Sequence, residues 1–190
     1  MSSDNPRILV FAGPNGSGKS TVTKAEQVVG VYVNADDLKR EMGCSDLEAA
    51  QKAETIRRYL LSKRIDFTFE TVLSTDRNLL LLEDAKNAGY VIRAVFVLTR
   101  DAAINIERVK NRVAAGGHDI PPEKIKSRYE KSLGNLMQLA KIASKTTVVD
   151  NSGNSPDIIC EISNGSAVIT PNQFWSKEDI LCLLSGAIRN

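Results

Sequence analysis

The sequence predicts an α/β fold in which a parallel sheet is flanked by helices. Stretches rich in β-forming residues alternate with helical patterns from about residue 7 to residue 150, which is typical of parallel strands joined by crossover helices. The first stretch, Arg7–Ala12, is continuously apolar after its arginine, as is typical of strands covered on both faces. The composition, with 42% hydrophobic and 25% charged residues, is ordinary for such a fold.

Turn residues divide the core into five expected strands, at residues 7–12, 31–33, 66–72, 90–98 and 146–150. Helical spacing of apolar residues predicts helices between them, at residues 19–28, 38–42, 47–63, 77–88, 101–114 and 122–143. Asp46 is a suitable N-cap for the long helix that starts at residue 47, and Asp76 for the helix that Gly89 ends. Pro122 suits the first turn of the last helix in this set.

The end of the chain has a different pattern. Residues 158–163 and 166–170 are β-forming and are separated by the turn dipeptide Asn164-Gly165, which predicts a β-hairpin. Ser176 and Asp179 stand at the spacing of a capping box and predict a closing helix. The hairpin and helix together occupy about residues 157–190.

Length, charge and cysteine content limit the classes of function. We expect one domain over residues 1–190, with a core at about 7–150 and a lid at about 108–128. The net charge of +2 is too small to indicate a nucleic-acid partner. Three cysteines without a C-x-x-C pair argue against a disulfide framework and for a reducing compartment. No apolar run is long enough to span a bilayer, so we expect a cytoplasmic protein without a membrane partner.

A phosphate-binding loop follows the first strand. Gly13–Ser20 fits the pattern G-x-x-x-x-G-K-[ST] between a strand and a helix. The glycines let successive N–H groups point at one anion, and the positive end of the helix favours negative charge. Lys19 would reach the β- and γ-phosphates, and the Ser20 hydroxyl would hold Mg²⁺. The alternative is an ordinary glycine turn, which the proline and glycines would weaken. The expected nucleotide-binding residues are Gly13, Pro14, Asn15, Gly16, Ser17, Gly18, Lys19, Ser20 and Thr21.

Acidic side chains follow the second and third expected strands. Asp36 and Asp37 come after residues 31–33, and Glu70 lies near the end of residues 66–72. Because ligands bind at the carboxyl ends of parallel strands, these carboxylates can accept the proton of an attacking hydroxyl or hold a metal through water. The alternative for Asp36 and Asp37 is to cap the short helix that follows. Glu70 closes an apolar run, where a carboxylate without a partner is costly to bury.

A basic segment with a glycine-rich break predicts a helical lid. Arg108 and Arg112 are four residues apart and share a helical face, and Arg128 lies beyond the break. Guanidinium groups on a closing segment stabilise the charge that develops on a transferred phosphoryl group. The alternative is a solvated basic surface. His118, the one histidine, lies in the break, where a local turn contact is a better interpretation than phosphate binding; one histidine also gives little basis for a histidine metal site.

Two motifs of other nucleotide-dependent proteins are absent from the sequence. No N-K-x-D follows a strand, as guanine recognition in a GTPase requires, and no L-S-G-G-Q-type signature of a transporter ATPase occurs. Transfer to a small acceptor is therefore favoured over motor work.

Four segments together resemble the zeta toxin family of P-loop kinases, across about residues 7 to 150: Gly13–Ser20, Val33–Leu38, Phe69–Thr71 and Ile106–Arg108 with the basic lid. The resemblance implies an adenylate-kinase-like core that transfers the γ-phosphate of ATP or GTP, with Mg²⁺, to a sugar hydroxyl of UDP-N-acetylglucosamine. It also implies an antitoxin protein as a partner, which would block the nucleotide site.

The resemblance implies roles for residues by position. Lys19 and Ser20 would take phosphate and Mg²⁺, and Asp36 would be the base on the acceptor hydroxyl. Glu54, in the helix before the third strand, would contact the acceptor, and Glu70 would lie near the acceptor or the metal.

The lid of this chain departs from the family pattern at one position. Arg108 would clamp the γ-phosphate, but the family's second lid arginine has no clear counterpart. The sequence leaves open whether Arg112, His118 or Arg128 completes the lid, with Arg112 and Arg128 the substitutes that the resemblance favours.

Three hypotheses about function remain. The first is a kinase that acts on a nucleotide sugar, and the second is a kinase that acts on another acceptor, such as a nucleoside, a sugar or the 5′ end of a nucleic acid. The third is a non-catalytic protein in which nucleotide binding closes the lid and changes an interaction surface. The choice of ATP or GTP, the acceptor and the oligomeric state stay open.

Overall fold

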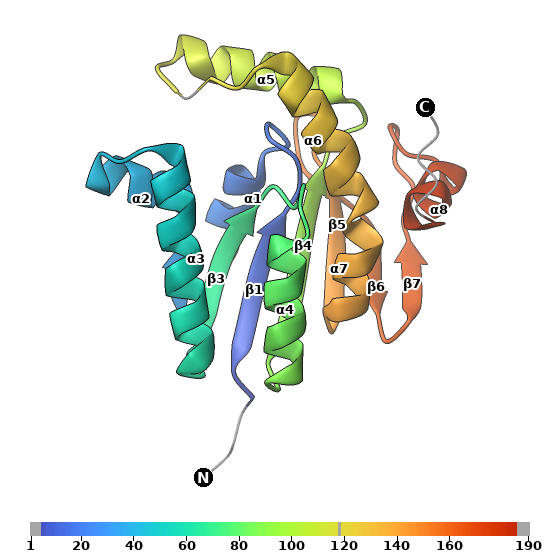
Figure 1. Cartoon of the computed structure of the whole chain (residues 1–190). Helices are drawn as coiled ribbons and strands as arrows, with labels where there is room; N and C mark the ends of the chain where they lie inside the picture. Colours follow the sequence, from blue (N-terminus) through green and yellow to red (C-terminus); the bar gives the residue numbers. More distant parts are fainter. Residues whose placement is uncertain (1–4, 118, 186–190) are drawn as a thin grey trace.

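The computed structural model describes residues 5–117 and 119–185 and shows a seven-stranded sheet in the order β2-β3-β1-β4-β5-β6-β7. The first five strands in that order are parallel, and β6 and β7 are antiparallel additions at one edge (Figure 1). The strands are β1 Arg7–Ala12, β2 Val31–Val33, β3 Phe67–Thr71, β4 Val91–Leu98, β5 Lys145–Asp150, β6 Asp157–Ser163 and β7 Ser166–Ile169. The expected α/β fold with a C-terminal hairpin is confirmed.

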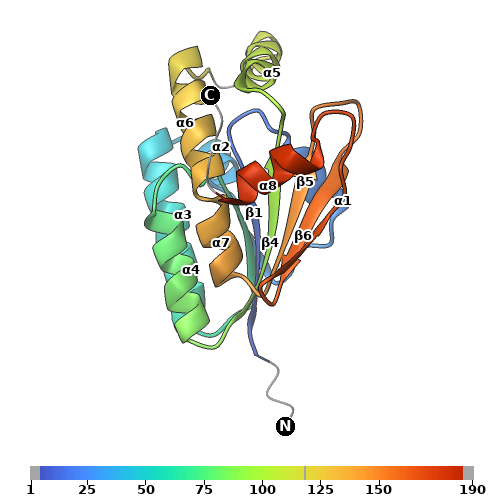
Figure 2. The same ribbon diagram turned by 90° about the vertical axis from the view of Figure 1, so that its right-hand side faces the viewer.

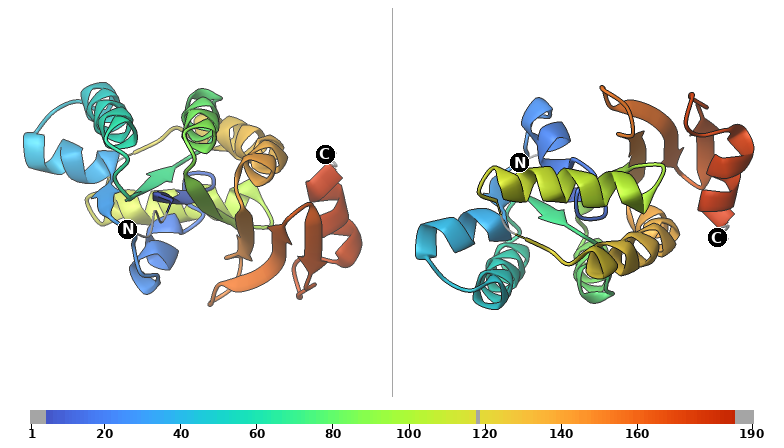
Figure 3. Two further views of the ribbon diagram at one scale, coloured as in Figure 1. Left: turned by 90° about the horizontal axis from the view of Figure 1, so that it is seen from below. Right: turned by 90° about the horizontal axis from the view of Figure 1, so that it is seen from above.

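Eight helices are assigned in the described residues, and they surround the sheet unequally. They are α1 Lys19–Ala25, α2 Ala35–Met42, α3 Asp46–Ser62, α4 Arg77–Asn87, α5 Ala102–Ala114, α6 Pro122–Gly134, α7 Leu136–Ile142 and α8 Lys177–Ser185. Helices α3, α4 and α7 cover one face, and α1 lies on the other (Figure 2). Helix α5 crosses above the carboxyl ends of the parallel strands (Figures 1 and 3). The basic segment is thus placed over the edge where the phosphate-binding loop emerges.

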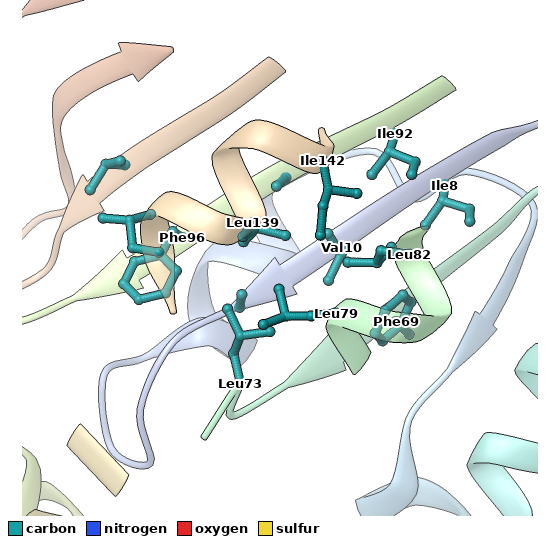
Figure 4. Packing of buried hydrophobic residues seen from close by; sticks show 14 of the residues in the cluster. Ile8, Val10, Phe69, Leu73, Leu79, Leu82, Ile92, Phe96, Leu139 and Ile142 are labelled. Carbon is teal, nitrogen blue, oxygen red and sulfur yellow. The ribbon is translucent and has the colours of Figure 1, made fainter. Parts of the chain in front are cut away.

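The alternating side chains of the central strands form two apolar layers. In β1, Ile8 and Val10 point into the large cluster beneath α3, α4 and α7, while Leu9 and Phe11 point into a small cluster beneath α1. Figure 4 shows Val10 near Leu79 and Leu82 of α4, with Ile8 on the Leu82 side of the same cluster. Burial on both faces explains why this strand has a continuous apolar sequence.

Three helix caps differ from the sequence-based expectation. Asp76 takes the N-cap position of α4, but its side chain makes no capping hydrogen bond. Ser45, not Asp46, caps α3: its hydroxyl accepts from the N–H of Glu48, whose carboxylate accepts from the N–H of Ser45. Asn34 caps α2 by accepting from the N–H of Asp36 at 2.8 Å, so neither Asp36 nor Asp37 is the cap. Each true cap is itself a residue type that favours this position.

Three helices differ in length from the prediction. The helix expected at residues 38–42 begins at Ala35, and the one expected to reach residue 28 ends at Ala25. The helix expected over residues 122–143 divides at Asn135 into α6 and α7. Gly134 and Asn135 have low helix propensity, and Asn135 Nδ2 donates to the carbonyl of Leu73 at 3.0 Å. This contact with the segment after β3 stabilises the break.

The C-terminal elements follow the predicted pattern. Asn164 and Gly165 have φ values of 51° and 75°, the left-handed conformations that a tight hairpin turn requires. Ser176 and Asp179 form the expected capping box, each side chain accepting from the other's N–H at 3.1 Å. Cys44, Cys160 and Cys182 are free thiols. In the described part of the chain, no helix has the length and apolar character to cross a membrane.

Candidate active site

The phosphate-binding loop lies between β1 and α1 and contacts β4 and α5 closely. A Cβ atom on Gly13, where φ is 139°, would collide with the carbonyl of Val97. A Cβ on Gly16, where φ is 78°, would come within 2.5 Å of the carbonyl of Asn105. Glycine is therefore required at both positions by backbone conformation and by space.

Side chains from three elements brace this loop. Asn105 of α5 donates to the carbonyl of Asn15 at 2.6 Å, and Asn151, just after β5, donates to the carbonyl of Ser17 at 2.8 Å. Arg128 of α6 donates to the Asn15 side chain at 3.1 Å. The loop conformation thus depends on contacts made by residues 90 to 134 positions away.

Lys19 is held inside the loop. Its Nζ donates to the carbonyls of Gly13 at 2.7 Å and Pro14 at 3.0 Å. Burial lowers the pKa of the Lys19 ammonium group to about 8, while the carboxylates of Glu70 and Asp36 act in the opposite direction. Lys19, Glu70 and Asp36 all line the same cavity.

A chain of hydrogen bonds joins the loop to the ends of β2 and β3. Ser20 Oγ donates to Glu70 Oε2 at 3.1 Å, and Tyr32 donates to Glu70 Oε1 at 2.7 Å. Asn34 Nδ2 donates to the Tyr32 hydroxyl at 2.9 Å. Burial is the main cause that raises the pKa of Tyr32 above its usual range, so the phenol stays a donor to Glu70 at neutral pH.

Asp36 lies in the first turn of α2 and lines the same cavity as Lys19. Its side chain is exposed, and within the described residues it forms no ion pair. The neighbouring Asp37 is engaged by Arg40 at 2.5 Å. Of the two aspartates, only Asp36 is among the residues that line the cavity.

The lid arginines lie on α5 and α6. Arg108, Arg112 and Arg128 all line the cavity. Nη2 of Arg108 donates weakly to the Gly153 carbonyl at 3.5 Å, and its Nη1 is buried without a hydrogen-bond partner in the described structure. Val109 and Ile125 hold α5 against α6 in a small apolar cluster. His118 lies outside the described residues, so its role stays a prediction.

One cavity of about 820 Å³ connects these groups, which is a typical size for a small-molecule site. Its wall runs from the loop through Asp36 and Glu70 to Arg57, Arg77 and the segment after β3. Glu54 does not line this wall: it forms ion pairs of 3.3 Å with Arg58 and with Arg77. Glu54 is therefore connected to the cavity by its ion pair with Arg77, which lines the wall.

The donor set at Ser20 fits a magnesium ion that is shared with phosphate. The Ser20 hydroxyl and the Glu70 carboxylate are adjacent, and the Asp36 carboxylate lines the same cavity. No cluster of three histidine, cysteine or acidic side chains in the described ranges could hold a metal by itself. Mg²⁺ commonly takes one or two protein ligands and completes its shell with water and phosphate oxygens, so these residues suit it.

Sequence reasoning missed several residues that shape the site. Asn151 directly follows the fifth strand, at the edge where ligands bind in such sheets. This position in the sequence is the signal that could have identified Asn151 as a site residue. Tyr32 falls in the expected strand at residues 31–33 and Asn105 in the expected helix at residues 101–114, and neither pattern indicates a role in the site. The same holds for Arg57 in the expected helix at residues 47–63. Its burial in the cavity wall follows from packing and has no local signal.

Comparison with sequence families gives one match that covers most of the chain. The sequence model of the Zeta toxin family matches residues 1–158. An uncharacterised protein from Haemophilus influenzae is 28% identical over 129 residues, which are 65% of this chain and 92% of that protein. A cytidylate kinase from Sulfurisphaera tokodaii is 31% identical over 113 residues, which are 56% of this chain and 61% of that enzyme.

Solved structures share the fold at low sequence identity. The AvrRxo1-ORF1:AvrRxo1-ORF2 structure with sulphate ions has a TM-score of 0.71 at 14% identity, and the match covers 98% of this chain and 66% of that one. A structure from the PezAT chromosomal toxin–antitoxin system of Streptococcus pneumoniae has a TM-score of 0.55 at 18% identity, over 98% of this chain and 85% of that one. This chain spans about two thirds of the first of these proteins.

Proposed function

Because the chain belongs to the Zeta toxin family and has a P-loop kinase-like fold, we propose that it transfers the γ-phosphate of ATP or GTP to a hydroxyl group of a small acceptor. Family and fold support a kinase-like phosphotransferase. One observation carries the proposal further: Asp36 and residues of the phosphate-binding loop line one cavity. That arrangement brings a donor phosphate and a candidate general base into one space.

The residues that bind the nucleotide surround its phosphates. The backbone N–H groups of the loop, residues 13–20, and the Lys19 ammonium group take the β- and γ-phosphates. Arg108, with its unpartnered buried Nη1, and Arg112 stabilise the negative charge that grows on the transferred group. Arg128 completes the site through its hydrogen bond to Asn15. The proposal thus assigns Arg108 and Arg112 to catalysis and Arg128 to positioning.

Asp36 serves as the general base. It accepts the proton of the acceptor hydroxyl as that oxygen attacks the γ-phosphorus, and the nucleoside diphosphate leaves. Ser20 would hold Mg²⁺, and Glu70, which accepts a hydrogen bond from Ser20, orients that hydroxyl and would act near the acceptor or the metal. When bound, Mg²⁺ neutralises charge on the β- and γ-phosphate oxygens. Glu54 shapes the acceptor side through Arg77.

The acceptor that we favour is a nucleotide sugar such as UDP-N-acetylglucosamine, on the basis of the family. The related structure from the PezAT system comes from a toxin–antitoxin pair. An antitoxin protein that covers the nucleotide site is therefore part of the proposal, as is a cytoplasmic location.

The test is phosphoryl transfer from γ-labelled ATP and GTP, with Mg²⁺, to a panel of UDP-N-acetylglucosamine, cytidine, CMP, gluconate and single-stranded oligonucleotides. Asp36→Asn is assayed beside the wild type. We expect label on the nucleotide sugar, a fall in turnover of about 10²- to 10⁴-fold in the variant, and nucleotide affinity close to that of wild type.

Other outcomes identify the alternatives. Label on another member of the panel would assign a different acceptor. Nucleotide binding without transfer to any acceptor would favour a non-catalytic, nucleotide-dependent interaction protein. Loss of nucleotide binding in Asp36→Asn would contradict the role given to Asp36.

A further inference from the structure

Arg57 of α3 is an almost fully buried arginine in the wall of the active-site cavity. Its exposed fraction is 6%, yet it lines the cavity. Its Nε is buried and has no hydrogen-bond partner in the described part of the chain. Buried polar groups in proteins are almost always hydrogen-bonded, so this donor needs an explanation.

Neutral groups hold the guanidinium of Arg57 in place. It lies over the ring of Phe69, 5.0 Å from the centroid, and its Nη2 donates to Asn78 Oδ1 at 3.4 Å. Asn78 Nδ2 donates to Thr71 Oγ1 at 2.8 Å, which turns the amide oxygen toward the arginine. These contacts orient the guanidinium, but none of them neutralises its charge.

No carboxylate in the described ranges forms an ion pair with Arg57. Glu54, three residues earlier, is engaged by Arg58 and Arg77. Burial lowers the pKa of Arg57 to about 10; Glu54 opposes this effect, while Arg58 and Arg77 add to it. The side chain is still charged at pH 7, and a buried charge without a counter-ion is unfavourable.

The cavity wall around Arg57 offers further hydrogen-bond donors. Ser74, Thr75 and Arg77 line the same cavity as Arg57 and Asn78. Leu73, where the chain enters this segment, has a φ of 56° and is held by hydrogen bonds from its N–H to Thr71 and from Asn135 to its carbonyl. Guanidinium and hydroxyl donors together match the several acceptor oxygens of a phosphate group.

We propose that Arg57 binds a phosphate group of the acceptor substrate, and so selects phosphate-bearing acceptors over neutral ones. This inference rests on the proposed function and specifies the acceptor side of the same site. The cavity then has two anion sites: the loop at residues 13–20 for the donor nucleotide, and Arg57 for the acceptor. Nucleotide sugars and sugar phosphates share the required chemistry.

The test measures acceptor-side binding with the nucleotide site filled. Protein saturated with Mg²⁺ and a non-hydrolysable ATP analogue is titrated calorimetrically with inorganic pyrophosphate, UDP, glucose 6-phosphate, uridine and N-acetylglucosamine. We expect the wild type to bind phosphate-bearing probes, and Arg57→Met to bind them about 10- to 100-fold more weakly, as the loss of a charge-assisted hydrogen bond implies. The relative affinities of UDP and glucose 6-phosphate distinguish a nucleotide sugar from a sugar phosphate as the source of the phosphate group.

Two variants and a second readout separate binding from structure. Arg57→Lys keeps the charge and should recover part of the affinity. Lys52→Gln removes an exposed positive charge of the same helix that does not line the cavity, and it should leave affinity unchanged. Because Arg57 is buried without a counter-ion, Arg57→Met should keep the wild-type melting temperature within a few degrees; a purely structural arginine would lower it.

The proposal is overturned if the wild type binds the ATP analogue but no phosphate-bearing probe, or if Arg57→Met binds such probes as tightly as wild type. Equal loss of affinity for the ATP analogue in Arg57→Met would also overturn it, because the effect would not be confined to the acceptor side. A wild type that fails to bind the ATP analogue contradicts the proposed function instead.

Discussion

Ser20 of the phosphate-binding loop donates a hydrogen bond of 3.1 Å to Glu70 at the end of β3, although 50 positions separate the two residues. The contact joins the hydroxyl that suits Mg²⁺ to a carboxylate that Tyr32 holds from the other side. In the proposed function, this contact links the donor side of the cavity to the acceptor side.

Replacing Glu70 with Gln should lower the apparent affinity of the enzyme for Mg²⁺. We expect the Mg²⁺ concentration for half-maximal activity to rise about 10- to 100-fold, as is usual when a partner of a metal ligand is lost. Tyr32→Phe removes only one hydrogen bond to Glu70 and should have a smaller effect in the same direction. An unchanged magnesium titration in Glu70→Gln would remove Glu70 from the metal site.

Lys19 predicts a pH effect on nucleotide binding. Its pKa of about 8 should rise when phosphates pair with the ammonium group, so binding should take up a proton above about pH 8 and affinity should fall as pH rises. Calorimetry at pH 7 and pH 9, in buffers of different ionisation enthalpy, measures this uptake. Lys19→Arg, which stays charged over this range, should show none from this site, and equal proton uptake in the two proteins would contradict the assignment.

The same lysine predicts a pH dependence of stability without nucleotide. Between about pH 8 and the ordinary value of 10.5, the unfolded chain binds more protons at this residue than the folded chain does. The contribution of Lys19 to the free energy of unfolding should therefore increase with pH in that window. Denaturant titrations of wild type and Lys19→Met at pH 7 and pH 10 isolate the contribution as a difference.

The lid arginines should differ in what they control. Arg108→Gln should lower kcat about 10²- to 10³-fold with little change in nucleotide affinity, as expected for a donor that acts mainly on transition-state charge. Arg128→Gln should raise the nucleotide Kd, because Arg128 contacts the loop at Asn15. Lys124→Gln, an exposed change on the same helix, is the control. Equal losses in all three variants would indicate a general charge effect.

Asn151 predicts a link between stability and nucleotide binding. Its side chain donates to the Ser17 carbonyl and lies against Gly18. Asn151→Ala should destabilise the protein by about 1–3 kcal/mol, because the buried carbonyl loses its partner, and should weaken nucleotide binding. Asn154→Ala, an exposed change in the same loop, should do neither. Thermal denaturation with and without nucleotide measures both effects.

The local sequence by itself determined the phosphate-binding loop and most of the secondary structure of this protein. The loop at residues 13–20, the five parallel strands and the hairpin turn at Asn164-Gly165 depend on interactions between neighbours or on apolar periodicity, so their patterns can be read directly. The helix caps were harder to predict: Ser45 and Asp46 are adjacent residues that both favour an N-cap, and only the path of the chain into α3 selects Ser45.

Tertiary structure decided which distant groups meet. The break between α6 and α7 is stabilised by Asn135 at the carbonyl of Leu73, and the Ser20–Glu70 hydrogen bond joins the first turn of α1 to β3. The sequence around Arg57 is that of an ordinary charged helix position. Packing nevertheless buries Arg57 in the cavity wall, with an exposed fraction of 6%. Long-range hydrogen bonds, burial and charge–charge interactions depend on distances in three dimensions. Periodicity along the chain does not encode these distances.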